Sequence, residues 1–294
     1  MTSSLPGGER PVLRFAPSPN GLLHLGHALC ALTNRSFADR MGGRLLLRIE
    51  DIDITRCRPE FEQAIHDDLA WLGLRFDGAV RRQSEHFDDY AAALSRLRQQ
   101  DVVYPCFCSR QHVRQAVAAR STAPERAWPH DPDGAPLYPG TCKSLASDTV
   151  RARIAAGEPH ILRLAMDRAG PEPAYVAFDD AGATRRVAVA PGRWGDVVLA
   201  RREIPTSYHL SVVIDDALQG VTHVVRGRDL EAATDIHVVL QRLLGLPTPL
   251  YHFHRLLLDQ GGEKLAKSRG SRALADLRAG GVTAGDIRAL LGFA

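Results

Sequence analysis

The fold is decided by residues 12–27, Val12-Leu13-Arg14-Phe15-Ala16-Pro17-Ser18-Pro19-Asn20-Gly21-Leu22-Leu23-His24-Leu25-Gly26-His27. Residues 12–16 predict a short β-strand, and the turn after it leads into a helix whose apolar residues recur at helical spacing up to Gly42. The apolar run at residues 44–50 predicts a second strand, buried on both faces. Strand, helix and strand in this order predict an α/β fold, a Rossmann-type doubly wound parallel sheet.

Two more helices are predicted in the first third of the chain. Pro59 is expected to begin one, because proline is tolerated at the first helical position, and apolar residues follow on one face up to Gly73. Ser84 is expected to cap the next helix. Residues 106–153 then lack clear periodicity, which predicts an insertion or a small separate lobe.

The α/β pattern resumes after this segment. Residues 212–214 and 221–226 are predicted as strands. Asp229 is expected to cap a further helix, which ends at Gly245.

The composition fits a globular protein with a sizeable core. Of the 294 residues 45% are hydrophobic, and the longest apolar runs are far shorter than a membrane span. Five cysteines, an odd number, argue against a fully paired disulfide framework, and the N-terminus does not resemble a secretion signal. We expect a cytoplasmic monomer without membrane contact. The net charge of +3 permits a nucleic-acid partner without requiring one.

Two motifs far apart in the chain carry groups suited to a nucleotide. His24 and His27 share one face of a predicted helix start, where unpaired backbone N–H groups attract phosphates, and Gly26 leaves room for a flat base or a ribose. Lys264 and Lys267 are two of only three lysines, and their compact charges suit an α-phosphate in a five-coordinate transition state. Each motif alone also fits a plain surface feature, but together they predict adenylate chemistry.

These two motifs together resemble the signature pair of class I aminoacyl-tRNA synthetases. Residues 14–21, residues 47–53, and Tyr208 with residues 213–216 are similar to the glutamyl-tRNA synthetase lineage in particular. The resemblance implies four catalytic residues, His24, His27, Lys264 and Lys267. It implies an ATP site, used with Mg²⁺, that consists of His24, Gly26, His27, Lys264, Lys267 and Ser268.

The resemblance also implies L-glutamate as a substrate. A dicarboxylate with an α-amino group needs cations for its carboxylates and an acid for its ammonium group. By resemblance Arg14 and Arg226 address the carboxylates and Glu50 the ammonium, while Ser18 and the Ala16 backbone line the site and Tyr208 closes it. A simple ion pair between Arg48 and Glu50 at the strand end is the alternative interpretation of those two residues.

Three cysteines indicate a metal site. Cys106 and Cys108 are alternate residues that a tight turn can direct at one ion, and Cys142 lies downstream. The lineage's insertion carries such a Cys-x-Cys, Tyr-x-x-x-Cys pattern, which implies one structural Zn²⁺ held by Cys106, Cys108, Tyr138 and Cys142. A phenol must lose its proton to bind a metal, so His112 and His130 remain alternatives for the fourth ligand. Three reduced, buried cysteines remain the alternative to any metal.

Few residues follow the lysine motif, so we expect no separate anticodon-binding domain. With the Cys/Tyr pattern and Arg226-Gly227-Arg228-Asp229-Leu230, this arrangement resembles the glutamyl-queuosine tRNA(Asp) synthetases. Members of that family form glutamyl-adenylate without tRNA and transfer glutamate to the cyclopentene-diol ring of queuosine in the anticodon of tRNA(Asp). The resemblance therefore implies an ATP-dependent ligase whose partners are ATP, L-glutamate and tRNA(Asp) carrying queuosine.

The same resemblance implies a division of the chain. The expected parts are 1–104, the first half of the Rossmann domain; 105–190, an insertion with a zinc-binding lobe; 191–245, the second half; and 246–294, the lysine loop with a short helical region.

Three other functions remain open. They are a truncated glutamyl-tRNA synthetase that charges tRNA(Glu) at its 3′ end, a related nucleotidyltransferase, and a catalytically silent paralogue that binds tRNA or zinc. The Arg14, Glu50, Tyr208 and Arg226 set argues against the nucleotidyltransferase. The intact histidine and lysine motifs argue against the silent paralogue.

Overall fold

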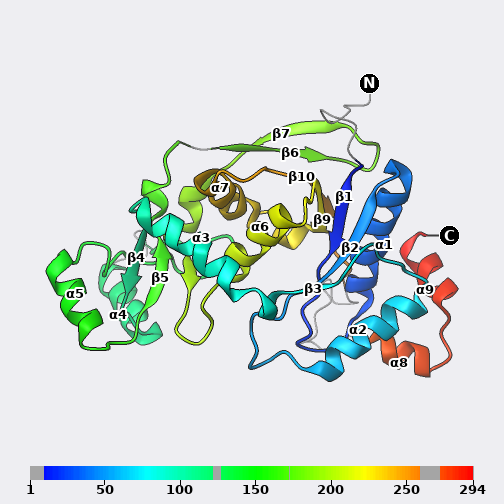
Figure 1. Ribbon diagram of the computed structural model, residues 1–294, viewed down its shortest axis with the longest axis horizontal. Coiled ribbons are helices and arrows are strands. Elements are labelled where there is room, and N and C mark those ends of the chain that lie inside the picture. The colour runs from blue at the N-terminus through cyan, green and yellow to red at the C-terminus, as the bar shows by residue number, and fades with distance from the viewer. Residues whose placement is uncertain (1–9, 122–126, 172, 259–271, 294) are drawn as a thin grey trace.

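The computed structural model describes residues 10–121, 127–171, 173–258 and 272–293. It begins with the predicted order of β1 (Val12–Phe15), α1 (Leu25–Met41) and β2 (Arg44–Ile49) (Figure 1). β1 and β2 pair in parallel, and α1 ends at Gly42 in the left-handed conformation that glycine adopts readily. α2 (Pro59–Trp71) begins at Pro59, as predicted.

Two sheets meet edge to edge in the centre of the molecule. One has the strand order β1-β2-β3 and the other the order β7-β6-β10-β9. The additional strands are β3 (Arg81–Arg82), β6 (Ala174–Phe178), β7 (Thr184–Ala188), β9 (His223–Gly227) and β10 (Leu250–His254). The carbonyl of Val12 accepts the Thr222 N–H at 2.9 Å next to β9, so β1 and β9 are neighbours. All these pairings are parallel except that of β7, which confirms the predicted parallel α/β core.

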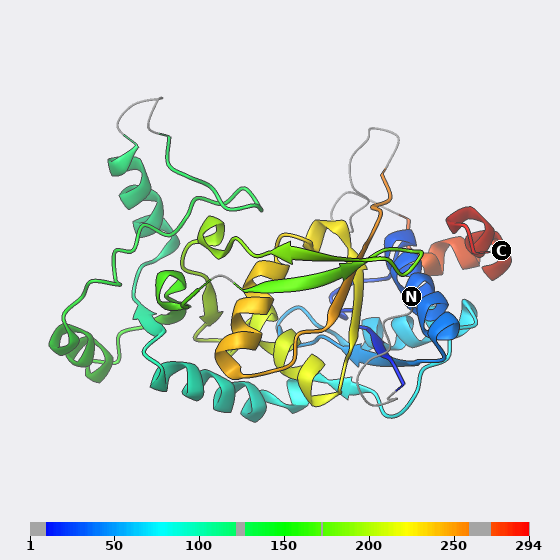
Figure 2. The same ribbon diagram turned by 90° about the horizontal axis from the view of Figure 1, so that it is seen from above.

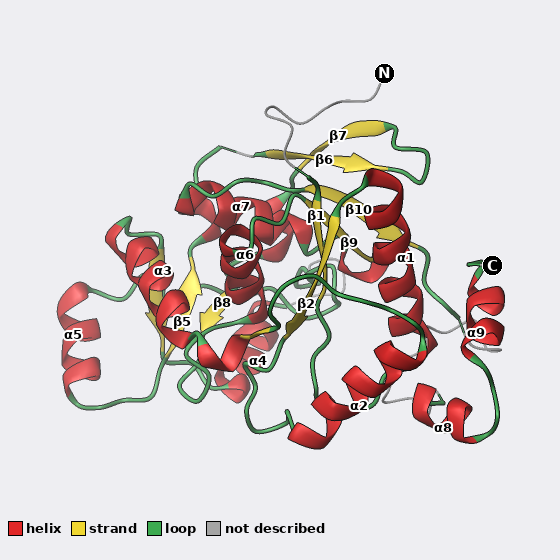
Figure 3. Cartoon of the chain, turned by 45° about the vertical axis from the view of Figure 1, so that its right-hand side comes forward, coloured by secondary structure: helices red, strands yellow, loops and turns green. Residues whose placement is uncertain are grey.

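Helices cover both faces of this core, as a doubly wound fold requires (Figure 3). On one face, Phe15 and Leu47 pack with α1, α2 and the C-terminal helices α8 (Leu274–Ala279) and α9 (Ala284–Leu291). On the other face, Val12 and Leu46 pack with α3 (Phe87–Gln99), α6 (Tyr208–Leu218) and α7 (Thr234–Leu244). Successive side chains of a strand alternate between these two faces.

A lobe lies at one end of the molecule, and α8 and α9 lie at the other end (Figure 2). The lobe holds an antiparallel sheet of β4 (Val103–Cys106), β5 (Ile161–Leu164) and β8 (Val198–Ala200). Its helices are α4 (Arg110–Arg120) and α5 (Ser147–Ala155), and neither buries a residue. Only Val113, Ala116 and Val117 of α4 share a half-buried face, so the apolar pattern of residues 106–153 is short.

Short 3₁₀ helices connect these elements: η1 (Gln83–Glu85), η3 (Met166–Arg168), η4 (Pro191–Trp194) and η5 (Arg228–Leu230). None of the helices in the described ranges combines the length and the apolar character needed to cross a membrane.

The sheet pairing does not follow the expected division of the chain at residue 190. β6 and β7 belong to the segment 105–190, yet β6 is hydrogen bonded to β10 of the central core. The structure itself fixes no domain boundaries, so the four expected parts stay an expectation.

Three local predictions are wrong. Residues 212–214 lie within α6, where they are buried; a short apolar run does not distinguish a buried helix from a strand. Ser84 does not cap a helix, because its N–H and its hydroxyl both donate to Asp51 and α3 begins only at Phe87. Asp229 lies in η5, and α7 begins at Thr234, although it ends at Gly245 as predicted.

Candidate active site

The two histidines of the first motif cap the start of α1. His24 Nδ1 accepts the Gly26 N–H at 3.0 Å, and His27 Nδ1 accepts the His24 N–H at 3.1 Å. Because each Nδ1 accepts a hydrogen bond, each ring carries a proton on Nε2. A Cβ atom at residue 26 would lie 2.8 Å from His24 Cε1, so this arrangement requires glycine. The motif thus provides two ring N–H donors at a helix N-terminus, where anions are favoured.

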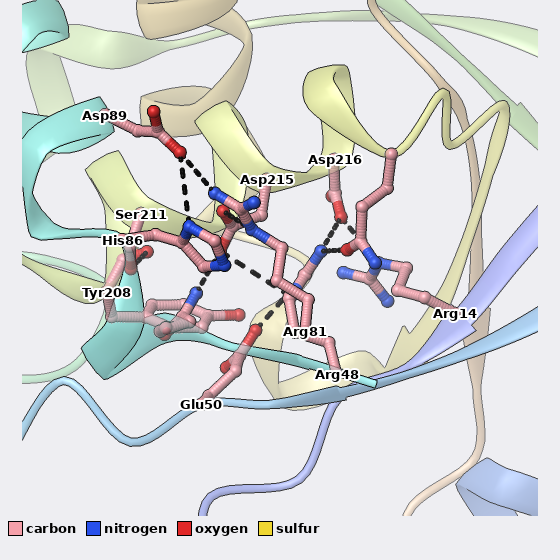
Figure 4. Close-up of polar contacts among 12 residues, drawn as sticks. Arg14, Arg48, Glu50, Arg81, His86, Asp89, Tyr208, Ser211, Asp215 and Asp216 are labelled. Atoms are coloured by element: carbon pink, nitrogen blue, oxygen red, sulfur yellow. Dashed lines mark hydrogen bonds and ion pairs between the residues drawn. The ribbon is translucent and has the colours of Figure 1, made fainter. Parts of the chain in front are cut away.

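Three charged residues point toward α6: Arg14 from β1, Arg48 from β2, and Glu50, which follows β2 (Figure 4). They do so because successive side chains of a strand alternate between its two faces. Arg14 Nε donates to Asp216 Oδ1 at 3.0 Å, and Arg48 Nη1 donates to the same oxygen at 2.8 Å. Arg48 Nη2 donates to Glu50 Oε1 at 3.2 Å. The ion pair of Arg48 and Glu50 therefore exists, but it is part of a network that also holds Arg14.

A second acid of α6 extends this network. The carboxylate of Asp215 accepts hydrogen bonds from Arg81 Nε at 2.7 Å, from Gln83 Nε2 at 2.7 Å and from the Tyr90 hydroxyl at 2.9 Å. Arg48 is 0% exposed, and buried charges are tolerated when they are paired and hydrogen bonded. The network therefore fixes the orientation of the groups at its edge, Arg14 and Glu50.

Burial and charge act in opposite directions on the acids of this network. Burial alone would raise the pKa of Asp216, but Arg14 and Arg48 more than offset it, so this pKa lies below its ordinary value. Burial raises the pKa of Glu50 above its ordinary value, because Arg48 and Arg14 oppose the effect only in part. A further cation next to Glu50 would therefore stabilise its ionised form.

Arg14 and Glu50, the groups at the edge of the network, line a cavity of about 560 Å³, a volume typical of small-molecule sites. The cavity lies where β1 and β9 end, and the carboxyl ends of parallel strands are the usual place for ligands in such folds. All predicted ATP and glutamate residues that the structure describes line it: Arg14, Ala16, Ser18, His24, Gly26, His27, Glu50, Tyr208 and Arg226. The structure brings these residues together, while their individual roles remain predictions.

Lys264, Lys267 and Ser268 lie outside the described residues, so their positions remain a prediction. The described chain reaches the cavity on both sides of them. Leu256 and Leu257, which follow β10, line the cavity. Ala273, which precedes α8, forms an antiparallel bridge with His24.

Arg226 is held by two residues of α7 that the sequence analysis missed. Its Nη2 donates to Thr234 Oγ1 at 2.6 Å, and its Nη1 donates to His237 Nδ1 at 3.0 Å. A threonine and a histidine among the apolar residues of a helix carry no sequence signal that separates such a role from plain burial. The parallel pairing of β9 with β10 and the packing of α7 create this contact.

The predicted metal ligands also lie together, in the lobe. The ligand atoms of Cys106, Cys108 and Cys142 lie within 4.8 Å of one another, and neither His112 nor His130 belongs to this group. The Tyr138 hydroxyl lies 3.2 Å from Cys106 Sγ and 3.5 Å from Cys108 Sγ. Three thiols and a phenol converging at this distance fit the donor set of a tetrahedral zinc site, with Cys106, Cys108, Cys142 and Tyr138 as the residues that would hold the ion.

A second cavity of about 600 Å³ adjoins the first. Ser18, Glu50 and Tyr208 line both cavities, and the lobe contributes Leu137 and Tyr138 to the second. A molecule in the second cavity can therefore contact one bound in the first.

Comparison with known proteins identifies the family. The family described as "tRNA synthetases class I (E and Q), catalytic domain" matches residues 12–283. A glutamyl-Q tRNA(Asp) synthetase of Rhodobacter capsulatus is 50% identical over 288 residues, which cover 96% of this chain and 99% of that protein. A protein of the same name from Symbiobacterium thermophilum is 42% identical, over 92% of this chain and 82% of the relative.

A solved structure supports the same fold. It is a glutamate tRNA ligase from Elizabethkingia meningosepticum in complex with its amino acid, with a TM-score of 0.73 and 28% sequence identity. The match covers 89% of this chain and 53% of that longer protein. The chain belongs to the class I tRNA synthetases for glutamate and glutamine, and among them to the glutamyl-Q tRNA(Asp) synthetases, which are ATP-dependent ligases.

Proposed function

We propose that this protein activates L-glutamate with ATP, without needing tRNA, and transfers the glutamyl group to queuosine in the anticodon of tRNA(Asp). The observation that carries the proposal is the single cavity in which the His24 and His27 donors lie with Arg14, Glu50 and Arg226. This set offers phosphate-binding donors, cations for two carboxylates and an acid for one ammonium group.

In the first step, an oxygen of the glutamate α-carboxylate attacks the α-phosphorus of ATP. A P–O bond forms to the carboxylate, the bond to the pyrophosphate oxygen breaks, and pyrophosphate leaves. His24 and His27 hold the nucleotide, and Lys264 and Lys267 offset the negative charge that develops on the α-phosphate. Mg²⁺ bound together with ATP would supply further positive charge at the phosphates.

In the second step, a hydroxyl oxygen of the queuosine cyclopentene-diol attacks the activated carbonyl carbon and forms an ester bond. The bond from this carbon to the phosphate oxygen breaks, AMP leaves with the bonding electron pair, and the hydroxyl proton passes to the departing phosphate. The mixed anhydride is reactive enough that positioning of the hydroxyl can suffice. The second cavity supports this step, because it shares Ser18, Glu50 and Tyr208 with the first and is also lined by Leu137 and Tyr138 of the lobe.

The Cys/Tyr cluster of the lobe is proposed to hold one structural Zn²⁺ ion. Its geometry favours Tyr138 over His112 and His130 as the fourth ligand, because only the Tyr138 hydroxyl is in contact with the thiols. When bound, such an ion stabilises the fold of the surrounding segment.

Transfer of labelled glutamate tests the acceptor. We expect labelling of queuosine-containing tRNA(Asp), also after removal of its 3′-terminal adenosine, and none of queuosine-free tRNA(Asp) or of tRNA(Glu). Periodate oxidation of the diols before the reaction should abolish the transfer. Labelling of tRNA(Glu) that depends on its 3′ end would instead support a truncated glutamyl-tRNA synthetase. The absence of any glutamate-dependent reaction would support a silent paralogue.

Lys267→Ala tests the adenylation step. We expect the rate of ATP–pyrophosphate exchange with glutamate to fall by about 100-fold or more, because a preorganised charge at the α-phosphate is lost. Lys143→Ala is the matched control. Lys143 pairs with Asp167 and Asp196 in the lobe, and its loss should leave the exchange rate within about threefold. An unchanged rate in Lys267→Ala would contradict the assignment.

A further inference from the structure

Two side chains of α7, Thr234 and His237, hold Arg226 from one side, and together they are called the Arg226 cradle. Arg226, Thr234 and His237 are 4%, 0% and 2% exposed, and the guanidinium gives one N–H to each of the two α7 side chains. Arg226 Nε is buried and has no hydrogen-bond partner among the described residues. The rings of Tyr251 and Phe253 face the guanidinium carbon at 5.4 Å and 5.8 Å and make cation–π contacts with it. Among the described residues, Thr234 and His237 are the hydrogen-bond acceptors of the guanidinium, and hydrogen bonds orient it more strictly than the ring contacts do.

A second histidine fixes the state of His237. A guanidinium can only donate hydrogen bonds, so His237 Nδ1 carries the lone pair and Nε2 carries the proton. His237 Nε2 lies 3.1 Å from His209 Nδ1, which accepts that proton's hydrogen bond. Burial and the charge of Arg226 lower the pKa of His209 to about 4 and that of His237 well below its ordinary value. Both rings are therefore neutral, and His237 presents an acceptor to Arg226.

We propose that Thr234 and His237, with His237 held in one tautomer by His209, are positioning residues that aim Arg226 at a carboxylate of glutamate. The inference rests on the proposed function, in which Arg226 binds that carboxylate. Hydrogen bonds to a guanidinium depend strongly on its orientation, because its donors form a rigid planar fork. Without the two acceptors the guanidinium can turn within its pocket, and its buried donors lose their partners.

The experiment measures glutamate-dependent ATP–pyrophosphate exchange in four variants of the full chain. His237→Leu removes the acceptor, His237→Asn restores an oxygen at the position of Nδ1, and Thr234→Val removes only a hydroxyl. His223→Leu is the matched control: His223 is a buried histidine of β9, 6% exposed, that contacts the Thr222 hydroxyl instead of Arg226. KM for glutamate, KM for ATP, kcat and the melting temperature are determined for each.

We expect His237→Leu to raise KM for glutamate about tenfold or more, since a hydrogen bond to a charged group is lost, with little change in kcat or in KM for ATP. His237→Asn should lie within about threefold of the unmodified protein, and Thr234→Val should raise KM for glutamate several-fold. His223→Leu should leave KM for glutamate unchanged.

Two results would overturn the inference: a folded His237→Leu variant with normal KM for glutamate, or a His237→Asn variant no better than His237→Leu. If His237→Leu does not fold, Thr234→Val takes its place, because valine has nearly the same shape as threonine. A normal KM for glutamate in Thr234→Val would then overturn the inference. If the unmodified protein shows no glutamate-dependent exchange, the proposed function fails instead.

Discussion

The Glu50 carboxylate contacts Arg48 through one oxygen and lines the active-site cavity. Ionised Glu50 is the partner expected for the substrate ammonium group, so Glu50→Gln, which keeps the shape and removes the charge, should weaken glutamate binding. We expect KM for glutamate to rise about 10- to 100-fold, the range for loss of a charged hydrogen bond, while KM for ATP stays the same. Glutamate-dependent ATP–pyrophosphate exchange measures both constants.

The pH dependence gives a second test of the same residue. Because burial raises the pKa of Glu50, its protonated fraction grows at a higher pH than for an exposed glutamate. In the unmodified protein KM for glutamate should therefore rise as the pH falls from 7 toward 5, whereas in Glu50→Gln it should not. Glu62→Gln, an acid of α2 that pairs with Arg82, should retain the profile of the unmodified protein. If KM for glutamate rises equally in Glu50→Gln as the pH falls from 7 toward 5, the proposed role of Glu50 is contradicted.

Helices and strands differed in how well their sequence predicted them. α1 and β2 were predictable because Gly42 separates a helical repeat from a short run of leucines. α6 was not predictable, because seven consecutive residues of this helix, Leu210 to Asp216, are buried and no polar face reveals its period. The site residues differ in the same way. Arg14 and Glu50 lie in local sequence motifs and were predictable, whereas Thr234 and His237 contact Arg226 only through the tertiary packing of α7 and were not.

The contact between α2 and α8 includes a buried acid that should make stability depend on pH. Asp68 on α2 is 0% exposed and lies 3.4 Å from Arg278 Nη2 on α8, but its carboxylate oxygens have no hydrogen-bond partner among the described residues. Burial raises the pKa of Asp68 to about 6. A carboxyl whose pKa is higher in the folded state binds a proton more readily there, so folding is favoured as the pH falls from about 7 to 5.

We expect this group to raise the free energy of unfolding by about 1 to 2 kcal/mol between pH 7 and pH 5. Asp68→Asn should remove that increment and be more stable than the unmodified protein at pH 7. Urea unfolding at both pH values measures the difference. Asp67→Asn changes the exposed neighbour and should keep the pH dependence. If the free energy of unfolding changes equally between pH 7 and pH 5 in Asp68→Asn and in the unmodified protein, the assignment of this group is contradicted.

At the scale of the whole molecule, the lobe lies at one end (Figure 2), and the second cavity is lined both by Tyr138 of its Cys/Tyr cluster and by Glu50 of the charge network. Cys106 and Cys142 are part of a small apolar cluster with Tyr104, Phe107 and Ala165. Loss of a metal ion from this position should therefore disturb the lobe first. The proposed activation of glutamate uses the first cavity, so it should depend on the ion much less than transfer to tRNA.

Cys142→Ser is expected to lose bound zinc, measured by metal analysis of the purified protein. Transfer of glutamate to tRNA should then fall at least about tenfold, while ATP–pyrophosphate exchange stays within about threefold, since structural zinc contributes to local folding. Tyr138→Phe should weaken zinc binding by removing one ligand. His112→Ala and His130→Ala should keep the full zinc content, because both histidines lie outside the thiol group. Zinc lost from either histidine variant, and kept in Tyr138→Phe, would assign the fourth ligand to that histidine.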